Sequence, residues 1–347
     1  MTTPAPGALM AAEIAQQPEV LRQALADPAE VTDAAARIRR AAPRFVVIAA
    51  RGTSDHAALY AKYLAEIRMG LAAGLASPSS LTVYGARPDL TDVLFLAVSQ
   101  SGGSPDLVDS VTAARECGAL TVAVTNAPSS ALAAAAEVHV DVRAGVEQAV
   151  AATKTYTAEL IALYLLLAGD GAAARAAGLP DAAAATLGLG TAAVAAAAAR
   201  YRYTSRVVTT ARGYSYPTAR EAALKLMETS YLSAQAFSGA DLLHGPLAMI
   251  DADVPVIAVT SAGRGGSAMI PVVDRLRESG ADVLQVGAPE GLAIAPDGLA
   301  IASDGIDEEL LPVLEILPLQ QLACQLAINR GADPDRPRGL SKVTRTW

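Results

Sequence analysis

The sequence carries one strand-to-helix junction twice, with the two copies 161 residues apart. An apolar run that begins at Phe45 ends in Ala-Arg-Gly-Thr-Ser54, and a second run that begins at Arg206 ends in Ala-Arg-Gly-Tyr-Ser215. A helical pattern follows each junction, and each copy then supplies further apolar strands with helices between them. Strands that alternate with helices form parallel sheets covered on both faces. The repeat therefore predicts an α/β protein with two doubly wound parallel sheets in tandem.

The length of the chain agrees with two domains. Its 347 residues are enough for two domains of roughly 150 residues each. The alanine-rich region between the two halves predicts helices, and two prolines after Gly331 predict an extended tail. The expected parts are a lead-in helix over 1–27, a first domain over 28–170, a helical connector over 171–200, a second domain over 201–331 and a tail over 332–347.

A polar loop follows the apolar strand Val93–Val98 and precedes a helical pattern from Pro105 to Cys117. Its sequence is Ser99-Gln100-Ser101-Gly102-Gly103-Ser104. Small residues at a helix N-terminus favour an anion, because free backbone N–H groups and the helix dipole point at it. The loop lacks the nucleotide P-loop pattern, so a phosphate monoester on a small molecule fits better than ATP; the alternative is an ordinary serine-rich turn. The second copy, Ser261–Gly265, lacks the repeated serines, so we expect one phosphosugar site per chain.

Charge and hydropathy narrow the classes of partner. The chain has 27 basic and 35 acidic residues and no basic run, which argues against nucleic acid or an anionic membrane. Its most apolar helical stretch, Leu160–Ala168, is too short to span a membrane, and the N-terminus lacks a signal-peptide pattern. Cys117 and Cys324 lie far apart in apolar helical patterns, so we expect reduced core cysteines and a cytoplasmic enzyme.

A carboxylate and an ammonium group share one face of the helix that follows the second junction. In Glu221-Ala-Ala-Leu-Lys225-Leu-Met-Glu228, the lysine lies four residues after the first glutamate and three before the second. If the pair is buried, a carboxylate beside a lysine suits the transfer of a proton between adjacent carbons of a sugar. The alternative is a ladder of salt bridges on the protein surface.

Two further residues could take part in sugar chemistry. His244 lies in the segment Asp-Leu-Leu-His-Gly-Pro, where it could open or close a sugar ring or could be a polar surface residue. Lys342 lies in Pro-Arg-Gly-Leu-Ser-Lys, where it is a Schiff-base candidate if the tail crosses an active site and a solvated lysine otherwise. The histidines (His56, His139 and His244) show no zinc spacing, so we expect no metal.

Together, these motifs resemble the sugar isomerase (SIS) family over nearly the whole chain. The resemblance is to the isomerase half of glucosamine-6-phosphate synthase and to stand-alone glucosamine-6-phosphate deaminases. It implies two SIS domains, each a flavodoxin-like three-layer sandwich. The segments that carry it are Met10–Pro18, Arg51–Ser54, Ser99–Gly102, Ala144–Lys154, Glu221–Glu228, His244–Asp251, Pro318–Ala323 and Pro337–Lys342.

The resemblance implies a role for each matching residue. Glu228 matches the carboxylate that moves a proton between C1 and C2, with Lys225 beside it. His244 matches a ring-opening histidine that reaches the site of a neighbouring subunit, which implies a homodimer. Lys342 matches the lysine that meets the open-chain ketose, and the backbone of Val150 matches a sugar contact. The sugar-phosphate cradle of a hexose 6-phosphate is matched by Ser54, Ser99, Gln100, Ser101 and Ser104.

The start of the chain sets the expected reaction within this family. A glutamine-dependent synthase needs a glutaminase domain whose cysteine follows the initiator methionine, whereas Thr2 follows Met1 here. We therefore expect a deaminase that converts glucosamine 6-phosphate and water into fructose 6-phosphate and ammonia without a cofactor. The alternatives are a galactosamine-6-phosphate deaminase/isomerase, a fructosamine-6-phosphate deglycase and a non-catalytic phosphosugar sensor. Such a sensor should lack the carboxylate and the histidine.

Overall fold

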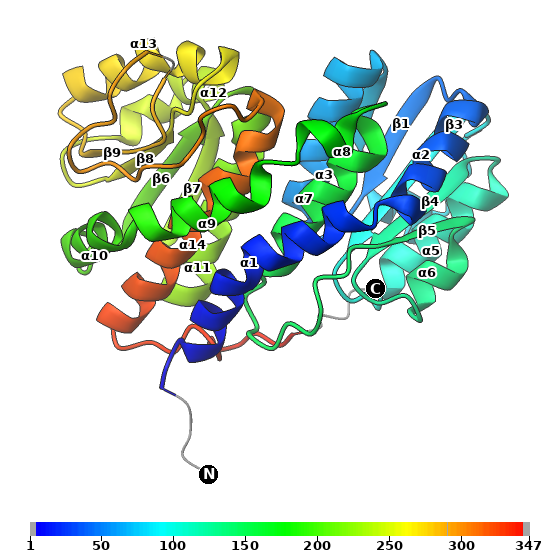
Figure 1. Cartoon of the computed structure of the whole chain (residues 1–347), viewed down its shortest axis with the longest axis horizontal. Helices are drawn as coiled ribbons and strands as arrows, with labels where there is room; N and C mark the ends of the chain where they lie inside the picture. Colours follow the sequence, from blue (N-terminus) through cyan, green and yellow to red (C-terminus); the bar gives the residue numbers. More distant parts are fainter. Residues whose placement is uncertain (1–4, 290, 343–347) are drawn as a thin grey trace. The chain divides into compact units, whose positions relative to one another are not determined.

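Within the residues that the structure describes, two parallel β-sheets form the framework of the chain (Figure 1). The computed structural model describes residues 5–289 and 291–342. It divides into two compact units, each built on one sheet. The first-sheet unit contains residues 19–147, 154–177 and 341–342. The second-sheet unit contains residues 5–18, 148–153 and 178–340.

The described part of the first sheet has parallel strands in the order β2-β1-β3-β4-β5. In register, Phe45 lies opposite Ala72 on one side and Val93 on the other. The order extends outward from β1 in one direction and from β3 in the other, so the carboxyl ends of these two strands form the switch point of the sheet. The strands are β1 (Phe45–Ala49), β2 (Ala72–Leu75), β3 (Val93–Ser99), β4 (Leu120–Thr125) and β5 (Val138–Asp141).

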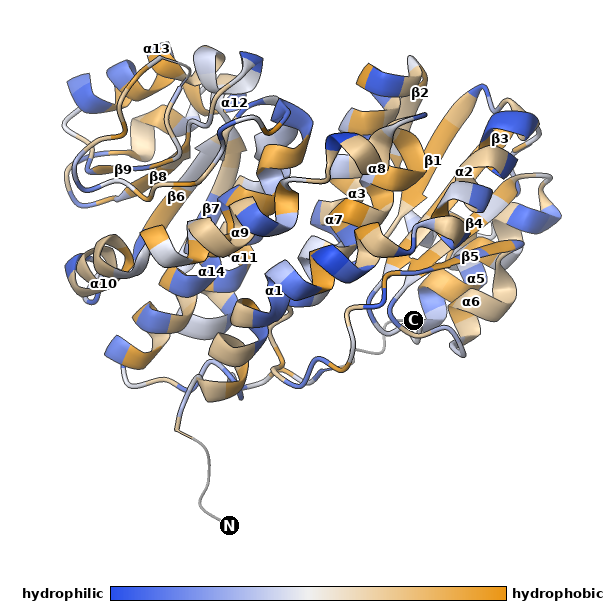
Figure 2. Cartoon of the chain, in the orientation of Figure 1, coloured by the Kyte–Doolittle hydropathy of each residue, from blue (hydrophilic) through white to orange (hydrophobic). Residues whose placement is uncertain are grey.

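Helices cover this sheet because its central strands are apolar on both faces. In Figure 2, strand β1 is hydrophobic. Helix α7 (Lys154–Leu167) is buried at every residue, which agrees with its apolar composition all round. The other helices of the first-sheet unit are α2 (Ala29–Ala41), α3 (Thr53–Leu64), a π-helical turn (Ala65–Met69), α4 (Pro78–Thr82), α5 (Pro105–Glu116), α6 (Ala131–Ala135) and α8 (Ala172–Arg175).

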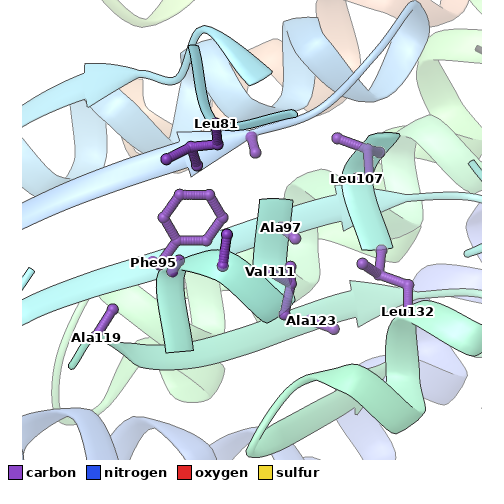
Figure 3. Close-up of a cluster of buried hydrophobic side chains, with 11 residues drawn as sticks. Leu81, Phe95, Ala97, Leu107, Val111, Ala119, Ala123 and Leu132 are labelled. Carbon is purple, nitrogen blue, oxygen red and sulfur yellow. The ribbon is translucent and has the colours of Figure 1, made fainter. Parts of the chain in front are cut away.

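A hydrophobic cluster anchors α4, α5 and α6 to this sheet. The ring of Phe95 on β3 points toward Leu81 of α4 (Figure 3), and both side chains are buried. Leu107 and Val111 of α5 and Leu132 of α6 belong to the same cluster. The N-terminus of α5 is therefore held over the end of β3 by packing of its own apolar face.

The second sheet repeats this topology with strands in the order β7-β6-β8-β9, all parallel. The expectation of two doubly wound parallel sheets is confirmed. The strands are β6 (Arg206–Ala211), β7 (Ser233–Ser238), β8 (Val256–Val259) and β9 (Val283–Val286). The helices are α9 (Leu179–Leu189), α10 (Thr191–Arg200), α11 (Tyr216–Ser230), α12 (Gly239–Leu243), α13 (Arg264–Glu278) and α14 (Leu311–Asn329), with 3₁₀ turns at Gly213–Ser215, Pro246–Met249 and Glu308–Leu310.

One helical stretch in the described chain has the length and mean hydropathy of a membrane span. It is Glu308–Asn329, and 83% of its apolar window is buried inside the protein. A bent helix pair over Ala172–Leu189 and Thr191–Arg200 passes the same test only if it is counted as one span. The stretch contains Glu308, Glu309 and Glu315, so it is not an uncharged apolar span. Its burial is that of a core helix.

The tail caps the first helix of the chain, α1 (Ala8–Ala26). The buried carboxylate of Asp335 accepts hydrogen bonds from the backbone N–H groups of Leu9, at 3.0 Å, and Met10, at 2.8 Å. Asp333 accepts a third, from Gly7, at 3.2 Å. Acidic side chains at a helix N-terminus satisfy free N–H groups and complement the helix dipole. Residues near the two ends of the described chain are thus joined within the second-sheet unit.

Candidate functional site

The serine-rich loop lies at the switch point of the first sheet, between β3 and α5. The Ser99 hydroxyl accepts a hydrogen bond from the Gly102 N–H at 3.2 Å, and the Ser101 hydroxyl accepts one from the Gly103 N–H at 3.3 Å. Gly102 has a φ of 58°, and a Cβ added there would overlap the Ser130 hydroxyl. The loop therefore needs glycine at this position both for its backbone and for its packing.

Ser104 is the N-cap residue of α5, but its side chain makes no capping hydrogen bond. Its hydroxyl is therefore available to a ligand at the helix N-terminus. Asp106 lies in the first turn of the same helix with its side chain 4% exposed. Arg51 neutralises it, because the guanidinium nitrogens lie 2.7 and 2.9 Å from one carboxylate oxygen. The Arg51 side chain is 45% exposed, so it can also face an anion above the loop.

The repeated serines have buried carboxylate partners. Ser54, at the start of α3, donates its hydroxyl hydrogen to Glu159 of α7 at 2.8 Å. Ser215 donates in the same way to Glu315 of α14, also at 2.8 Å. Both glutamates are fully buried. The donor hydrogen of Ser54 is therefore engaged with Glu159, whereas the hydroxyls of Ser99 and Ser101 accept hydrogen bonds and keep their own hydrogens available.

The lysine–glutamate cluster on α11 is buried. The Lys225 ammonium lies 2.5 Å from Glu228 and 3.3 Å from Glu221, and the side chains of Lys225 and Glu221 are 1% and 0% exposed. The alternative of a surface ladder is therefore wrong. Burial alone would lower the pKa of Lys225, but the two carboxylates outweigh it and raise that pKa above its ordinary value. Glu228 is 21% exposed, so its carboxylate can be reached by a small molecule.

His244 and Val150 belong to the same unit as this cluster. His244 follows α12, which is capped by the Ser238 hydroxyl, and its side chain is exposed with no hydrogen-bond partner among the described residues. The following Gly245 has a φ of 124°, a conformation that glycine adopts without the strain of a side chain. The Val150 N–H donates to the Asp335 carbonyl at 3.4 Å.

Lys342 lies in the first-sheet unit and is not a free surface lysine. Its ammonium is 3.1 Å from a carboxylate oxygen of Glu147, whose side chain is 0% exposed. Lys342 and the loop that contains Ser99, Gln100, Ser101 and Ser104 belong to the first-sheet unit, and Lys225, Glu228, His244 and Val150 belong to the second-sheet unit. Of these residues, Lys225 and Glu228 are in direct contact. The described residues contain no group of three or more His, Cys, Asp or Glu side chains placed to hold a metal.

The second sheet has its own cavity, of about 620 Å³, beside the loops after β8 and β9. It contains none of the predicted site residues. At its edge the Glu308 carboxylate accepts a hydrogen bond from the Gly265 N–H, at 2.7 Å, in the first turn of α13. The chain's own carboxylate thus occupies the helix terminus that corresponds to the N-terminus of α5 in the first sheet. This difference supports the expectation of one phosphosugar site per chain.

Tandem doubly wound sheets of matching topology define a protein built from a duplicated α/β domain. The chain belongs to the SIS domain family, whose sequence model matches residues 41–169 and 187–330. It is similar to glutamine–fructose-6-phosphate aminotransferase (isomerizing) of Gloeobacter violaceus, with 34% identity over 355 residues. That match covers 96% of this chain and 58% of the relative, so the chain spans a little over half the length of that relative.

Two solved structures share the fold over almost their whole length. A candidate phosphosugar isomerase of Silicibacter pomeroyi is 34% identical with a TM-score of 0.81, and the match covers 94% of this chain and 99% of that one. Glucosamine-6-phosphate deaminase of Thermotoga maritima matches with a TM-score of 0.78 over 98% of this chain and 100% of that one. Its identity is 20%, so this second likeness shows the fold alone.

Proposed function

We propose that this chain is an aldose–ketose isomerase of amino-sugar 6-phosphates that releases ammonia, converting glucosamine 6-phosphate and water into fructose 6-phosphate and ammonia. The observation that carries the proposal is the buried Lys225 ammonium between two carboxylates, one of which, Glu228, is partly exposed. A surface ion pair would have no such arrangement. The names of the relatives, an isomerizing aminotransferase and a candidate phosphosugar isomerase, support the same class of reaction.

The residues divide the reaction into binding and proton transfer. The hydroxyls of Ser99, Ser101 and Ser104 and the N-terminus of α5 bind the 6-phosphate. His244 moves the proton that opens the sugar ring. Glu228 then removes the C2 proton of the open-chain aldose and returns it to C1, with the Lys225 ammonium beside the carboxylate.

The proposed reaction needs no net oxidation or reduction. Moving the C2 proton to C1, with a proton passing from the nitrogen to O1, converts the 2-amino aldehyde into a 2-imine with a hydroxymethyl group at C1. Water adds to C2, and the C–N bond breaks with the departure of ammonia. The product is fructose 6-phosphate, and Lys342 contacts its open-chain form. General acid–base groups supply each proton transfer, typically about 10²–10⁴-fold in rate per group.

The exposed, unbonded side chain of His244 supports the second part of the proposal, a homodimer. A histidine that acts in the site of a neighbouring subunit must project from its own protomer, as His244 does. Each protomer of a two-fold dimer would then complete the site of its partner.

The proposal is tested by measuring the release of ammonia and fructose 6-phosphate from glucosamine 6-phosphate in the absence of glutamine. Galactosamine 6-phosphate and fructosamine 6-phosphate are assayed as alternative substrates. We expect Glu228→Gln to lower turnover by about 10²–10⁴-fold, because it keeps size and hydrogen bonding but removes the base. Binding of a hexose 6-phosphate should be nearly unchanged.

Three outcomes would contradict this reading. Preferential turnover of galactosamine 6-phosphate or fructosamine 6-phosphate would assign one of the related enzymes instead. Full turnover by Glu228→Gln would show that another group is the base. Tight binding of these sugars without turnover by the native protein would identify a phosphosugar sensor.

A further inference from the structure

The last described residue of the tail is held by a carboxylate that is buried. Glu147 follows β5, and one of its oxygens lies 3.1 Å from the Lys342 ammonium. Its side chain is 0% exposed, while that of Lys342 is 24% exposed. A buried carboxylate needs a charged or hydrogen-bonding partner, and a charge-assisted bond restricts the position of both groups. The ion pair therefore fixes where the last part of the tail lies in the first-sheet unit.

Glu147 is itself fixed from its other side. Its second carboxylate oxygen accepts the backbone N–H of Thr155, at 3.2 Å, in the first turn of α7. The N-terminus of a helix favours a negative charge. Because α7 is buried along its whole length, the carboxylate rests on one of the most rigid elements of the unit. Lys342 is thus attached to the core rather than to a loose surface loop.

The segment that carries Glu147 is also tied to the serine-rich loop. The Asn126 side chain donates to the Gly145 carbonyl at 2.8 Å and accepts from the Ala144 N–H at 2.8 Å. The Asn126 N–H donates to the Gln100 carbonyl at 3.2 Å. A continuous series of hydrogen bonds therefore joins the loop at Gln100 to the segment that precedes Glu147. All of these residues belong to the first-sheet unit.

We infer that Glu147 is a positioning residue: it holds the Lys342 ammonium in a fixed place relative to the serine-rich loop, ready for a sugar whose phosphate that loop binds. The inference rests on the proposed function for the role of Lys342 at the open-chain sugar. The ion pair itself does not depend on that role.

The test combines Glu147→Gln, Lys342→Met and the double variant. Glutamine keeps an oxygen that can accept the Thr155 N–H, so the cap of α7 is retained while the charge is lost. Glu147→Asp keeps the charge on a shorter side chain. Glu66→Gln is the matched control, because Glu66 and Lys62 form another glutamate–lysine pair in the same unit, at 2.6 Å, that is partly exposed and on one helical surface.

The first measurement needs no turnover. In substrate-free protein, brief reductive methylation followed by peptide mass spectrometry reports how fast each lysine reacts. We expect Glu147→Gln to raise labelling of Lys342 by about tenfold, which corresponds to about 1.4 kcal/mol, with labelling of Lys62 unchanged. Glu66→Gln should raise labelling of Lys62 alone. An unchanged rate at Lys342 in Glu147→Gln overturns the inference.

The second measurement is a double-mutant cycle on kcat and KM. If Glu147 acts through Lys342, the double variant has the same kcat as Lys342→Met, and Glu147→Asp recovers part of the loss seen in Glu147→Gln. Additive losses overturn the inference, because they show that Glu147 acts independently of Lys342. If the native protein turns over no amino-sugar phosphate, the proposed function fails. The labelling result then still decides whether Glu147 holds the lysine.

Discussion

At the scale of single residues, buried charged side chains have the largest effect on stability. Lys225 and Glu221 are both fully buried, and Glu228 completes the cluster at its exposed edge. Removing a lysine from such a cluster leaves a buried carboxylate with an unbalanced charge, which is much more costly than losing a surface pair. The lysine therefore stabilises the fold as well as supporting the proton chemistry proposed for Glu228.

We expect Lys225→Met to lower the free energy of unfolding by about 3–5 kcal/mol, because the buried Glu221 carboxylate loses the opposite charge of Lys225. Urea unfolding followed by circular dichroism measures the change. Lys62→Met is the control, since its pair with Glu66 is partly exposed and should contribute less than about 1 kcal/mol. Equal losses in the two variants would contradict a buried cluster.

At the scale of elements, the two domains differ at their helix N-termini. Helix α5 follows a loop in which Gly102 leaves no room for a side chain. At the N-terminus of α13, the Glu308 carboxylate accepts the Gly265 N–H. Both domains keep a serine that donates to a buried glutamate on their last long helix. The duplication thus preserves the serine–glutamate hydrogen bond and changes what lies at the helix N-terminus.

We expect Gly102→Ala to weaken binding of hexose 6-phosphates by at least about tenfold, because the left-handed backbone alone costs about 1–2 kcal/mol and the methyl group would also overlap Ser130. Titration calorimetry with glucose 6-phosphate measures the loss. Gly280→Ala is a matched control, since Gly280 also has a positive φ, of 78°, but no atoms within 4 Å of the added Cβ. Its stability should fall while binding is kept. Unchanged binding in Gly102→Ala would exclude this loop as the phosphate site.

A pH prediction follows from Glu315. Burial raises its pKa above the ordinary value of 4.5, against the hydrogen bonds from Ser215 and Thr218. Above that ordinary value the unfolded chain has lost a proton that the folded protein still holds, so this group lowers stability as pH rises until the folded pKa is passed. We expect Glu315→Gln to show a smaller fall in unfolding free energy over this range, measured by urea unfolding at several pH values. Parallel pH profiles would contradict the direction of the shift.

Much of the fold could be predicted from the sequence, because apolar runs such as Val93–Val98 identify central strands without reference to the rest of the chain. Strand β2 could not. Its sequence, Ala-Ala-Gly-Leu, has no alternation, and it is a strand because β1 pairs with it. The segment before α7 also depends on a distant residue, because the buried carboxylate of Glu13 accepts hydrogen bonds from the N–H groups of Gln148 and Ala149, and the helix begins at Lys154.

The site shows the same division between local and distant information. The residues of the serine-rich loop lie within one short segment of the sequence, and so do those of the α11 cluster. Both could therefore be predicted from the sequence. The pairs Arg51–Asp106 and Glu147–Lys342 join residues 55 and 195 positions apart. No periodicity or spacing contains such a pair. The repeated arginine of the Ala-Arg-Gly junction was the available signal for the first of them.

At the scale of the whole molecule, the proposed homodimer makes a prediction about mixtures. Glu228→Gln and His244→Ala proteins should each be inactive, but subunit exchange between them should restore up to about a quarter of native activity, because each mixed dimer then has one intact site. Exchange is verified by mass spectrometry of the intact dimer, and native protein mixed with each variant is the control. No recovery after verified exchange would show that both residues act within one protomer.

The cap that Asp335 places on α1 also has a consequence for biosynthesis. Helix α1 contains the N–H groups that this carboxylate satisfies, and the carboxylate is made 325 residues after Met10. Residues 5–18 therefore lack their cap until translation has passed Asp335. The first-sheet unit, most of which lies between residues 19 and 177, can gather its strands earlier. Translation thus imposes an order in which residues 5–18, although synthesised before the first-sheet unit, settle after it.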